Sequence, residues 1–199
     1  MRVLVVGASG TIGRAIVAEL EPRHEVIAAG RSSGDLRTDV TDSTAIRTMF
    51  EKAGSVDALV SATGSVKFAP FENMGEKDYE IGLKDKLMGQ VNLVLIGRDY
   101  LSAGGSFTLT SGVLDRDPIL QGTSASMVNG AINAFVAAAA IEMPRGQRIN
   151  VVSPGVIEEA MEVYAPFFRG FEPVPAARAA LAYAKSVEGA QTGGVFRVD

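Results

Sequence analysis

Short apolar runs bounded by glycine alternate along the chain with amphipathic segments of helical length. This alternation is typical of β-α units that form a parallel sheet covered by helices on both faces. We predict strands at residues 3–6, 25–29, 36–38, 56–60, 106–110, 148–152 and 194–198. We predict helices at residues 11–20, 43–52, 76–99 and 123–142, with a mostly helical excursion at 158–186. Asp42 is the expected N-cap of the helix at 43–52. The expected fold is a doubly wound α/β sheet of about seven strands, the Rossmann type, formed by residues 1–199 as a single domain.

Composition narrows the function classes. The chain has 199 residues, of which 47% are apolar and 21% charged, and this is a globular composition. The net charge of −4 provides no basic surface for nucleic acid. Without Cys and with His24 as the single histidine, neither a disulfide nor a metal site is expected. The chain starts directly on a strand, and no apolar run is long enough to span a bilayer, so we expect a cytoplasmic protein with no membrane partner.

A glycine-rich turn follows the first predicted strand. "VLVVGASGTIGRAIVAEL" places Gly7, Gly10 and Gly13 where a tight turn, a close backbone approach to a pyrophosphate and close helix packing are needed. The unpaired N–H groups of Thr11, Ile12 and Gly13 would face an anion. Three glycines alone indicate only a tight turn between strand and helix. With a strand before and a helix after, they predict a dinucleotide site.

The end of the second predicted strand, "IAAGRSSG", indicates which dinucleotide. Gly30 stands where an NAD enzyme usually has a carboxylate for the adenosine ribose. Arg31 offers a guanidinium, and Ser32 and Ser33 add hydroxyl donors, a combination suited to a 2′-phosphate. NADP(H) is therefore favoured over NAD(H). The alternative is that Arg31 is an ordinary solvated loop arginine.

Taken together, these residues resemble the short-chain dehydrogenase/reductase family over nearly the whole chain. Asp39-Val40 in "RTDVTD" is similar to its adenine-contacting pair, and "SATG", residues 61–64, stands where the family has Asn-Asn-Ala-Gly. "RINVVSPGV" resembles the segment whose Pro154-Gly155 would frame the nicotinamide, with the Ile157 backbone near its carboxamide. The expected cofactor-binding residues are Gly7, Ser9, Gly10, Thr11, Ile12, Gly13, Arg31, Ser32, Asp39, Val40, Ala62, Thr63, Gly64, Pro154, Gly155 and Ile157.

The resemblance does not extend to all catalytic groups. In the family a Ser orients the carbonyl, a Tyr transfers the proton, and a Lys lowers the pKa of that tyrosine and holds the nicotinamide ribose. Aligning Ser111 in "LTSG" with the family serine places Ser124 at the tyrosine and Val128 at the lysine. An aliphatic alcohol is a poor general acid, and valine carries no charge. Ser124 is thus either a weak catalytic substitute or merely the cap of a helix beginning near Ala125.

A lysine on another helix could restore the missing cation. Lys86 stands where the family has a catalytic Asn, and we hypothesise that it binds the nicotinamide ribose and polarises a substrate oxygen, its pKa lowered by burial. Helical spacing predicts that Lys86 shares one face of its helix with Leu83, Gln90, Leu93 and Val94. The alternative is a solvated lysine, because lysines are rarely buried without a partner. Glu158 and Glu159 are expected at the surface or paired with Lys86.

The segment after Pro154-Gly155, about residues 156–186, corresponds to the substrate lid of the family. Tyr164 in "VYAPFFRGF" could act there as a substitute acid. Alternatively, it belongs to an aromatic wall with Phe167, Phe168 and Phe171. Such a wall would suit an apolar substrate.

The helix "SASMVNGAINAFVAAAAIEM", residues 123–142, has small or apolar residues almost all round and needs cover on every side. The resemblance implies that this helix and the one at 76–99 pair with the same elements of another subunit. We therefore expect a homodimer or homotetramer with two-fold symmetry. The alternative is burial against the sheet within a monomer.

Three functions are open at this point. We favour an NADPH-dependent oxidoreductase acting on a small apolar carbonyl or conjugated enone, in which Ser111 holds the oxygen and Lys86 or water completes proton transfer. The second is an NADP(H)-binding sensor or scaffold without turnover, as the absence of both Tyr and Lys suggests. The third is a non-redox lyase or isomerase that uses the same pocket.

Overall fold

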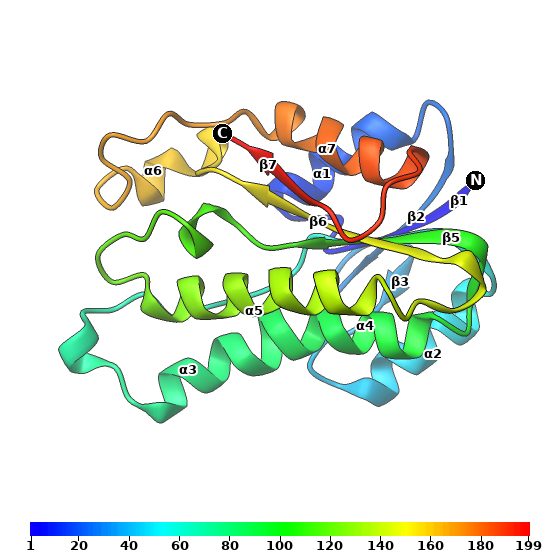
Figure 1. The fold of residues 1–199 in the computed structure, drawn as a ribbon, viewed down its shortest axis with the longest axis horizontal. Helices are drawn as coiled ribbons and strands as arrows, with labels where there is room; N and C mark the ends of the chain where they lie inside the picture. The colour runs from blue at the N-terminus through cyan, green and yellow to red at the C-terminus, as the bar shows by residue number, and fades with distance from the viewer.

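The strands form one fully parallel sheet in the order β3-β2-β1-β4-β5-β6-β7 in the computed structural model, which describes all 199 residues (Figure 1). Their bounds are β1 Arg2–Val6, β2 Glu25–Gly30, β3 Leu36–Arg37, β4 Val56–Ser61, β5 Leu101–Thr110, β6 Arg148–Pro154 and β7 Val195–Val198. The direction of winding reverses between β1 and β4, which leaves a crevice beyond their carboxyl ends. The predicted doubly wound α/β fold is confirmed.

The helices cover both faces of this sheet. They are α1 Thr11–Leu20, α2 Ser43–Ala53, α3 Glu76–Gly82, α4 Gly89–Gly97, α5 Thr123–Ala139, α6 Met161–Tyr164 and α7 Ala176–Glu188. Helices α1 and α7 pack on one face, and α2, α4 and α5 pack on the other (Figure 1). Asp42 caps α2 as expected, because its carboxylate accepts a hydrogen bond of 2.8 Å from the Thr44 N–H.

Alternate residues of each strand serve two separate cores. In β1, Leu4 and Val6 pack toward the α2, α4 and α5 side, whereas Val3 and Val5 pack toward α1 and α7. All four side chains are completely buried. The central strands are therefore apolar on both faces, which explains their unbroken hydrophobic runs in the sequence. No helix of the structure has both the length and the apolarity needed to cross a bilayer.

The predicted helix at 76–99 is interrupted. A π-helical segment, η2 (Leu83–Met88), joins α3 to α4 and carries Lys86. A π turn holds an additional residue, so it shifts the phase of every side chain that follows. For this reason Leu83, expected on the same face as Lys86, is 37% exposed, whereas Gln90 and Leu93 are completely buried.

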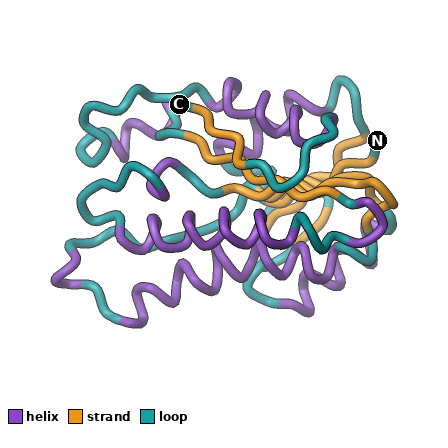
Figure 2. The backbone as a smooth tube through the Cα atoms, viewed as in Figure 1, coloured by secondary structure: helices purple, strands orange, loops and turns teal.

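The loops that follow the strands gather at one end of the molecule, at the left of Figure 2. They include the turn after β5 with the short helix η3 (Val113–Asp115) and the segment after β6 that leads through η5 (Glu158–Ala160) and α6. A third, smaller apolar cluster holds these loops together. Its buried members are Val113, Leu114, Ala125, Val156 and Phe168.

Candidate functional site

The glycine loop has the backbone geometry that a dinucleotide site requires. Gly7 has a φ of +86°, and a Cβ atom there would lie 2.5 Å from the Ala62 carbonyl oxygen. A Cβ atom on Gly13 would lie 2.0 Å from the Gly7 carbonyl oxygen, so α1 can approach β1 only with glycine at this position. The N–H groups of Thr11, Ile12 and Gly13 have no partner within the protein. These residues fit a pyrophosphate at the start of α1.

A cavity of about 410 Å³ opens beside this loop, at the carboxyl ends of β4, β5 and β6. It is lined by Gly10, Thr11, Ile12, Ala62, Thr63, Gly64, Val66, Phe68, Lys86, Thr110, Ser111, Gly112, Val113, Leu114, Ala125, Asn129, Pro154, Gly155, Val156, Ile157, Ala160, Tyr164 and Phe168. The structure thus brings Lys86 and Ser111 together with most of the predicted cofactor-binding residues. Gly7, Ser9 and Gly13 of the glycine loop lie outside the lining, as do Arg31, Ser32, Asp39 and Val40, which follow β2 and β3.

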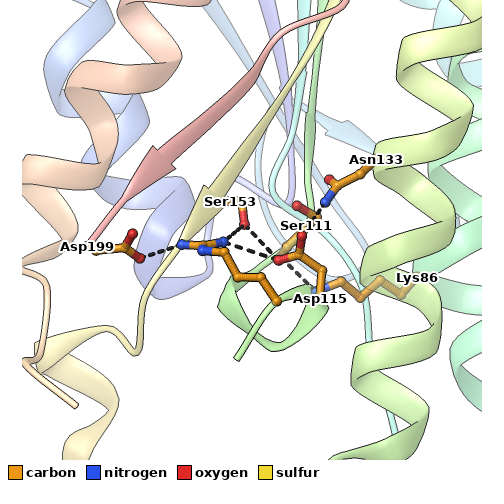
Figure 3. Close-up of polar contacts among 7 residues, drawn as sticks. Lys86, Ser111, Asp115, Asn133, Ser153 and Asp199 are labelled. Carbon is orange, nitrogen blue, oxygen red and sulfur yellow. Dashed lines mark hydrogen bonds and ion pairs between the residues drawn. The ribbon is translucent and has the colours of Figure 1, made fainter. Parts of the chain in front are cut away.

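Lys86 lies within the site and is partly buried. Its Nζ donates a hydrogen bond of 3.2 Å to the Ser111 carbonyl oxygen, and Figure 3 shows it reaching from its helix toward the turn that carries Ser111. Burial lowers the pKa of Lys86 to about 8, and the negative charge of Asp85 opposes this change. The side chain thus points into the cavity, although part of its surface stays accessible. Glu158 and Glu159 form no ion pair with Lys86, since Glu158 is exposed and the Glu159 carboxylate accepts the Ala176 N–H.

Two features fix the position of Lys86. A Cβ atom on Gly64 would lie only 2.5 Å from Lys86 Cγ, so glycine at this position leaves room for the lysine side chain. The buried Gln90 amide donates to the carbonyl oxygens of Lys86, at 3.1 Å, and Thr110, at 2.8 Å. It also accepts the Thr110 N–H at 2.8 Å. Gln90 thereby ties the π-helical segment to the end of β5.

The side of α5 that faces the cavity differs from the alignment. Ser124 and Val128 pack against Gly82, where a Cβ atom would lie 3.1 Å from Ser124 Oγ and 3.2 Å from Val128 Cγ1. The cavity is lined instead by Ala125 and Asn129. The alternative that Ser124 caps the helix is also wrong, because α5 begins at Thr123 and the Ser124 hydroxyl has no hydrogen-bond partner.

Sequence reasoning did not identify Asn129. The side chain is 3% exposed and lines the cavity. Ser111 is also 3% exposed, and its hydroxyl has no partner within the protein. The sequence did offer a signal for this residue, because Asn129 is an amide in a helical segment of mostly small and apolar residues. It lies four residues after Ala125 and therefore on the same face of the helix.

At the adenosine end, Gly30 and Arg31 follow β2. A Cβ atom on Gly30 would lie 2.9 Å from the Ser33 carbonyl oxygen, so a carboxylate side chain has no room there. The Arg31 side chain is 64% exposed, with Nε 3.5 Å from Asp39 Oδ2 and Nη2 3.4 Å from Asp85 Oδ2. Hydrogen bonds from Thr41 hold the pKa of Asp39 below its usual value, and the charge of Arg31 contributes further.

The remaining adenosine-end residues differ in their accessibility. Ser32 is exposed. Val40 is buried in the core, where a Cβ atom on Gly89 would lie 2.9 Å from its Cγ2. Val40 therefore packs against the start of α4, and of the Asp39-Val40 pair only Asp39 presents a polar group.

At the opposite end, Pro154, Gly155 and Ile157 line the cavity beneath the lid. The Ile157 N–H has no partner within the protein, so it is free to meet a carboxamide. Tyr164 packs on Phe68 and Phe168, with ring centroids 6.0 Å and 6.1 Å away. These three rings form the aromatic wall of the cavity, and Phe171 packs behind Phe168 at 5.2 Å.

A polar cluster holds the turn after Ser111 in place (Figure 3). Asn133 of α5 donates a hydrogen bond of 2.8 Å to Asp115 of η3. Arg116 pairs with Asp115 at 3.1 Å, donates to the Ser153 hydroxyl of β6 at 2.7 Å, and also pairs with Asp199. The turn is thus joined to α5, to β6 and to the end of the chain.

The sequence is similar to a known protein family and to known reductases and oxidoreductases. A family model described as Enoyl-(Acyl carrier protein) reductase matches residues 8–195. Elsinochrome reductase 1 of Elsinoe fawcettii is 27% identical over 183 residues, which is 79% of this chain and 68% of that protein. The uncharacterized oxidoreductase Mb1385 of Mycobacterium bovis is 25% identical over 209 residues, 93% of this chain and 85% of that protein.

Solved structures extend the comparison. The protein lin1944 from Listeria innocua is 53% identical and has a TM-score of 0.99, with 100% of both chains covered. A small-chain dehydrogenase in complex with NADPH is 26% identical and has a TM-score of 0.89, covering 100% of this chain and 96% of that one. The fold and its dinucleotide crevice define a nucleotide-binding oxidoreductase class. Within it, the chain belongs to the short-chain dehydrogenase/reductase family, whose members bind nicotinamide cofactors.

Proposed function

We propose that the protein is an NADP(H)-dependent oxidoreductase that reduces a small apolar carbonyl compound or a conjugated enone. The observation that carries this proposal is Lys86, a partly buried amine that lines the cavity with no carboxylate bonded to it and with the unpartnered Ser111 hydroxyl nearby. A structural lysine would be expected to end in an ion pair or at the surface.

Each group has a separate chemical task. When bound, the reduced nicotinamide cofactor supplies the hydride. Ser111 donates its hydroxyl hydrogen bond to the substrate oxygen, and Lys86 stabilises the negative charge that develops there and provides the proton, directly or through water. The wall formed by Phe68, Tyr164 and Phe168 excludes water and strengthens these interactions.

The cofactor we propose is NADP(H) rather than NAD(H). Arg31 and Ser32 stand at the end of β2, and Gly30 leaves no space for a carboxylate that would repel a 2′-phosphate. On this proposal Arg31 exchanges its long contacts with Asp39 and Asp85 for the phosphate. The NADPH complex of the small-chain dehydrogenase supports the same choice.

The proposed substrate class rests on the lining of the cavity, where Lys86 is the only residue with an ionisable amine or carboxylate. A neutral compound with one reactive oxygen fits such a site. The name of elsinochrome reductase 1 supports a reductase of an organic carbonyl, and the family description supports an enone.

We also propose a homo-oligomer with two-fold symmetry, formed through α3, η2, α4 and α5. Large apolar side chains stay exposed along these elements, at 41–44% for Ile81, Met88, Leu95 and Met127. A second copy of the same helices would bury them.

The second candidate function is an NADP(H) sensor without turnover. It is favoured by one observation, that neither Ser124 nor Val128 lines the cavity, so the family's tyrosine and lysine have no replacement on α5 at those positions.

One experiment separates the two candidates. NADPH is titrated into the protein, and a panel of ketones, aldehydes and enones is then added while the absorbance of the reduced cofactor is followed. Consumption that is strongly reduced in Ser111→Ala and in Lys86→Ala supports the oxidoreductase. Tight NADPH binding without consumption for any compound supports the sensor and would overturn our first proposal.

A further inference from the structure

The amide of Asn129 is a polar group in the cavity that the proposed chemistry does not use. It is 97% buried by the surrounding chain, being only 3% exposed. Its Oδ1 has no partner, and its Nδ2 donates no hydrogen bond within the protein. Exchanging the oxygen and nitrogen of the amide therefore changes nothing, since neither end is bonded to the chain. A buried amide left unpaired in this way is destabilising unless a ligand completes it.

The surroundings of Asn129 indicate what kind of ligand this is. A Cβ atom on Gly112 would lie 3.2 Å from Asn129 Nδ2, so the amide lies beside the residue that follows Ser111. Lys86, in contrast, lies against Gly64, next to the segment expected to meet the cofactor. The amide therefore belongs to the substrate side of the cavity, with Val113 and Leu114 of η3 as further lining residues.

The chemistry of an amide restricts the substrate further. Oδ1 only accepts hydrogen bonds, so the matching group must carry a hydrogen, and Nδ2 only donates. A hydroxyl group can satisfy the amide in either orientation, as donor to Oδ1 or as acceptor from Nδ2, whereas a second carbonyl oxygen can satisfy Nδ2 alone. The site around the amide holds no carboxylate that would bind a charged donor, so a neutral hydroxyl fits it better than an ammonium.

We propose that Asn129 is a substrate-binding residue and that the preferred substrates are hydroxylated aromatic carbonyl compounds. The hydroxyl bonds to the Asn129 amide, the carbonyl oxygen meets the Ser111 hydroxyl, and the ring system packs on Phe68, Tyr164 and Phe168. This inference rests on the proposed function for the role of the carbonyl, but the hydroxyl preference is a property of binding alone.

The test is therefore made by equilibrium binding. 2-Acetylnaphthalene and its ring-hydroxylated isomers are titrated calorimetrically into NADP⁺-loaded protein. Isomers with the hydroxyl next to the acetyl group are left out, because they satisfy that hydroxyl internally. We expect at least one isomer to bind the wild-type protein about tenfold more tightly than the parent ketone. In Asn129→Leu the preference should fall to within about twofold, with the affinity for the parent ketone little changed.

Two further variants make the result decisive. Asn129→Ala suits a helix already rich in alanine and replaces the leucine variant if circular dichroism shows that the latter is misfolded. Ser126→Ala is the control, because it also removes a buried unpartnered hydroxyl from α5 but does not line the cavity, and it should keep the preference. The proposal is overturned if no isomer is preferred, or if the preference survives in the Asn129 variants. A preference without NADPH consumption would retain this assignment and reject the oxidoreductase proposal.

Discussion

The glycine loop and the catalytic side of the cavity lie at the same edge of the sheet but follow the family pattern to different degrees. Gly7, Gly10 and Gly13 lie within seven consecutive residues, and the roles of Gly7 and Gly13 depend on backbone geometry that no other residue can supply. The polar groups of the catalytic side come from separate elements, namely Lys86 from η2, Ser111 from the end of β5 and Asn129 from α5. Another element can supply a charge or a hydrogen-bond donor to the same place, whereas no other element can supply the space that a glycine leaves by lacking a Cβ atom.

The largest effect is expected from Gly13→Ala. The new Cβ atom would lie 2.0 Å from the Gly7 carbonyl oxygen, so α1 must move away from β1. We expect the free energy of unfolding to fall by about 3 kcal/mol and NADPH binding to be lost. Urea unfolding and fluorescence titration of NADPH measure the two effects. Unchanged stability would show that α1 does not pack tightly against the Gly7 carbonyl oxygen at this position.

Gly10→Ala is the matched control for this prediction. Gly10 has an ordinary φ of −71°, and its nearest contact would be the Gly7 carbonyl oxygen at 3.4 Å. The fold should therefore stay as stable as the wild type. Because Gly10 lines the cavity, NADPH binding should still weaken. The two variants together separate the packing of the loop from its contact with the cofactor.

The next largest effect concerns Lys86. Lys86→Met keeps the length of the side chain but removes the charge and the proton, and we expect kcat to fall by about 10²- to 10⁴-fold. In the wild type, kcat for reduction should decline as the pH rises above about 8, where Lys86 loses its proton. Lys84→Met is the control, because Lys84 is 70% exposed and pairs only with Glu80. Equal losses in both variants would contradict a specific role for Lys86.

The same contrast explains what the sequence could predict. The strands, the tight turn at Gly7 and the cap at Asp42 follow from local pattern, and the structure confirms them. The face of α5 that meets the cavity does not follow from local pattern. Small and apolar residues surround this helix, so the sequence does not distinguish a helix that turns Ser124 toward the cavity from one that turns Ala125 toward it. The π turn at residues 83–88, which Gln90 joins to the distant strand β5 through the carbonyl oxygens of Lys86 and Thr110, does not follow from local pattern either.

Burial of Lys86 also predicts how stability depends on pH. Its pKa falls from 10.5 to about 8 on folding, so between these values the unfolded chain binds the proton and the folded chain does not. Stability therefore rises with pH in this window, by about 3 kcal/mol, and is flat below it. Urea unfolding of the wild type and Lys86→Met at pH 7, 8, 9 and 10 measures the difference, since the variant lacks this increase. If the free energies of unfolding of the two proteins changed with pH in parallel, Lys86 would be solvated in the folded protein.

A smaller effect is expected at the adenosine end. Arg31→Met should weaken NADPH binding about tenfold, because a charge-assisted hydrogen bond to the 2′-phosphate is lost. The effect is moderate, since Arg31 must first leave Asp39 and Asp85. NADH binding should change less than about twofold. Arg37→Met, an exposed arginine on β3, controls for net charge. Equal weakening for both cofactors would remove the basis for NADP(H).

The smallest effect is expected at Tyr164, and it decides between two proton donors. Tyr164→Phe keeps the ring that packs between Phe68 and Phe168 and removes only a hydroxyl that has no hydrogen-bond partner within the protein. If Lys86 provides the proton, kcat should change less than about twofold, because the aromatic wall stays intact. A loss of about 100-fold or more would instead assign the proton to the tyrosine hydroxyl. The catalytic side of the cavity would then keep the family's phenol, supplied from the lid instead of from α5.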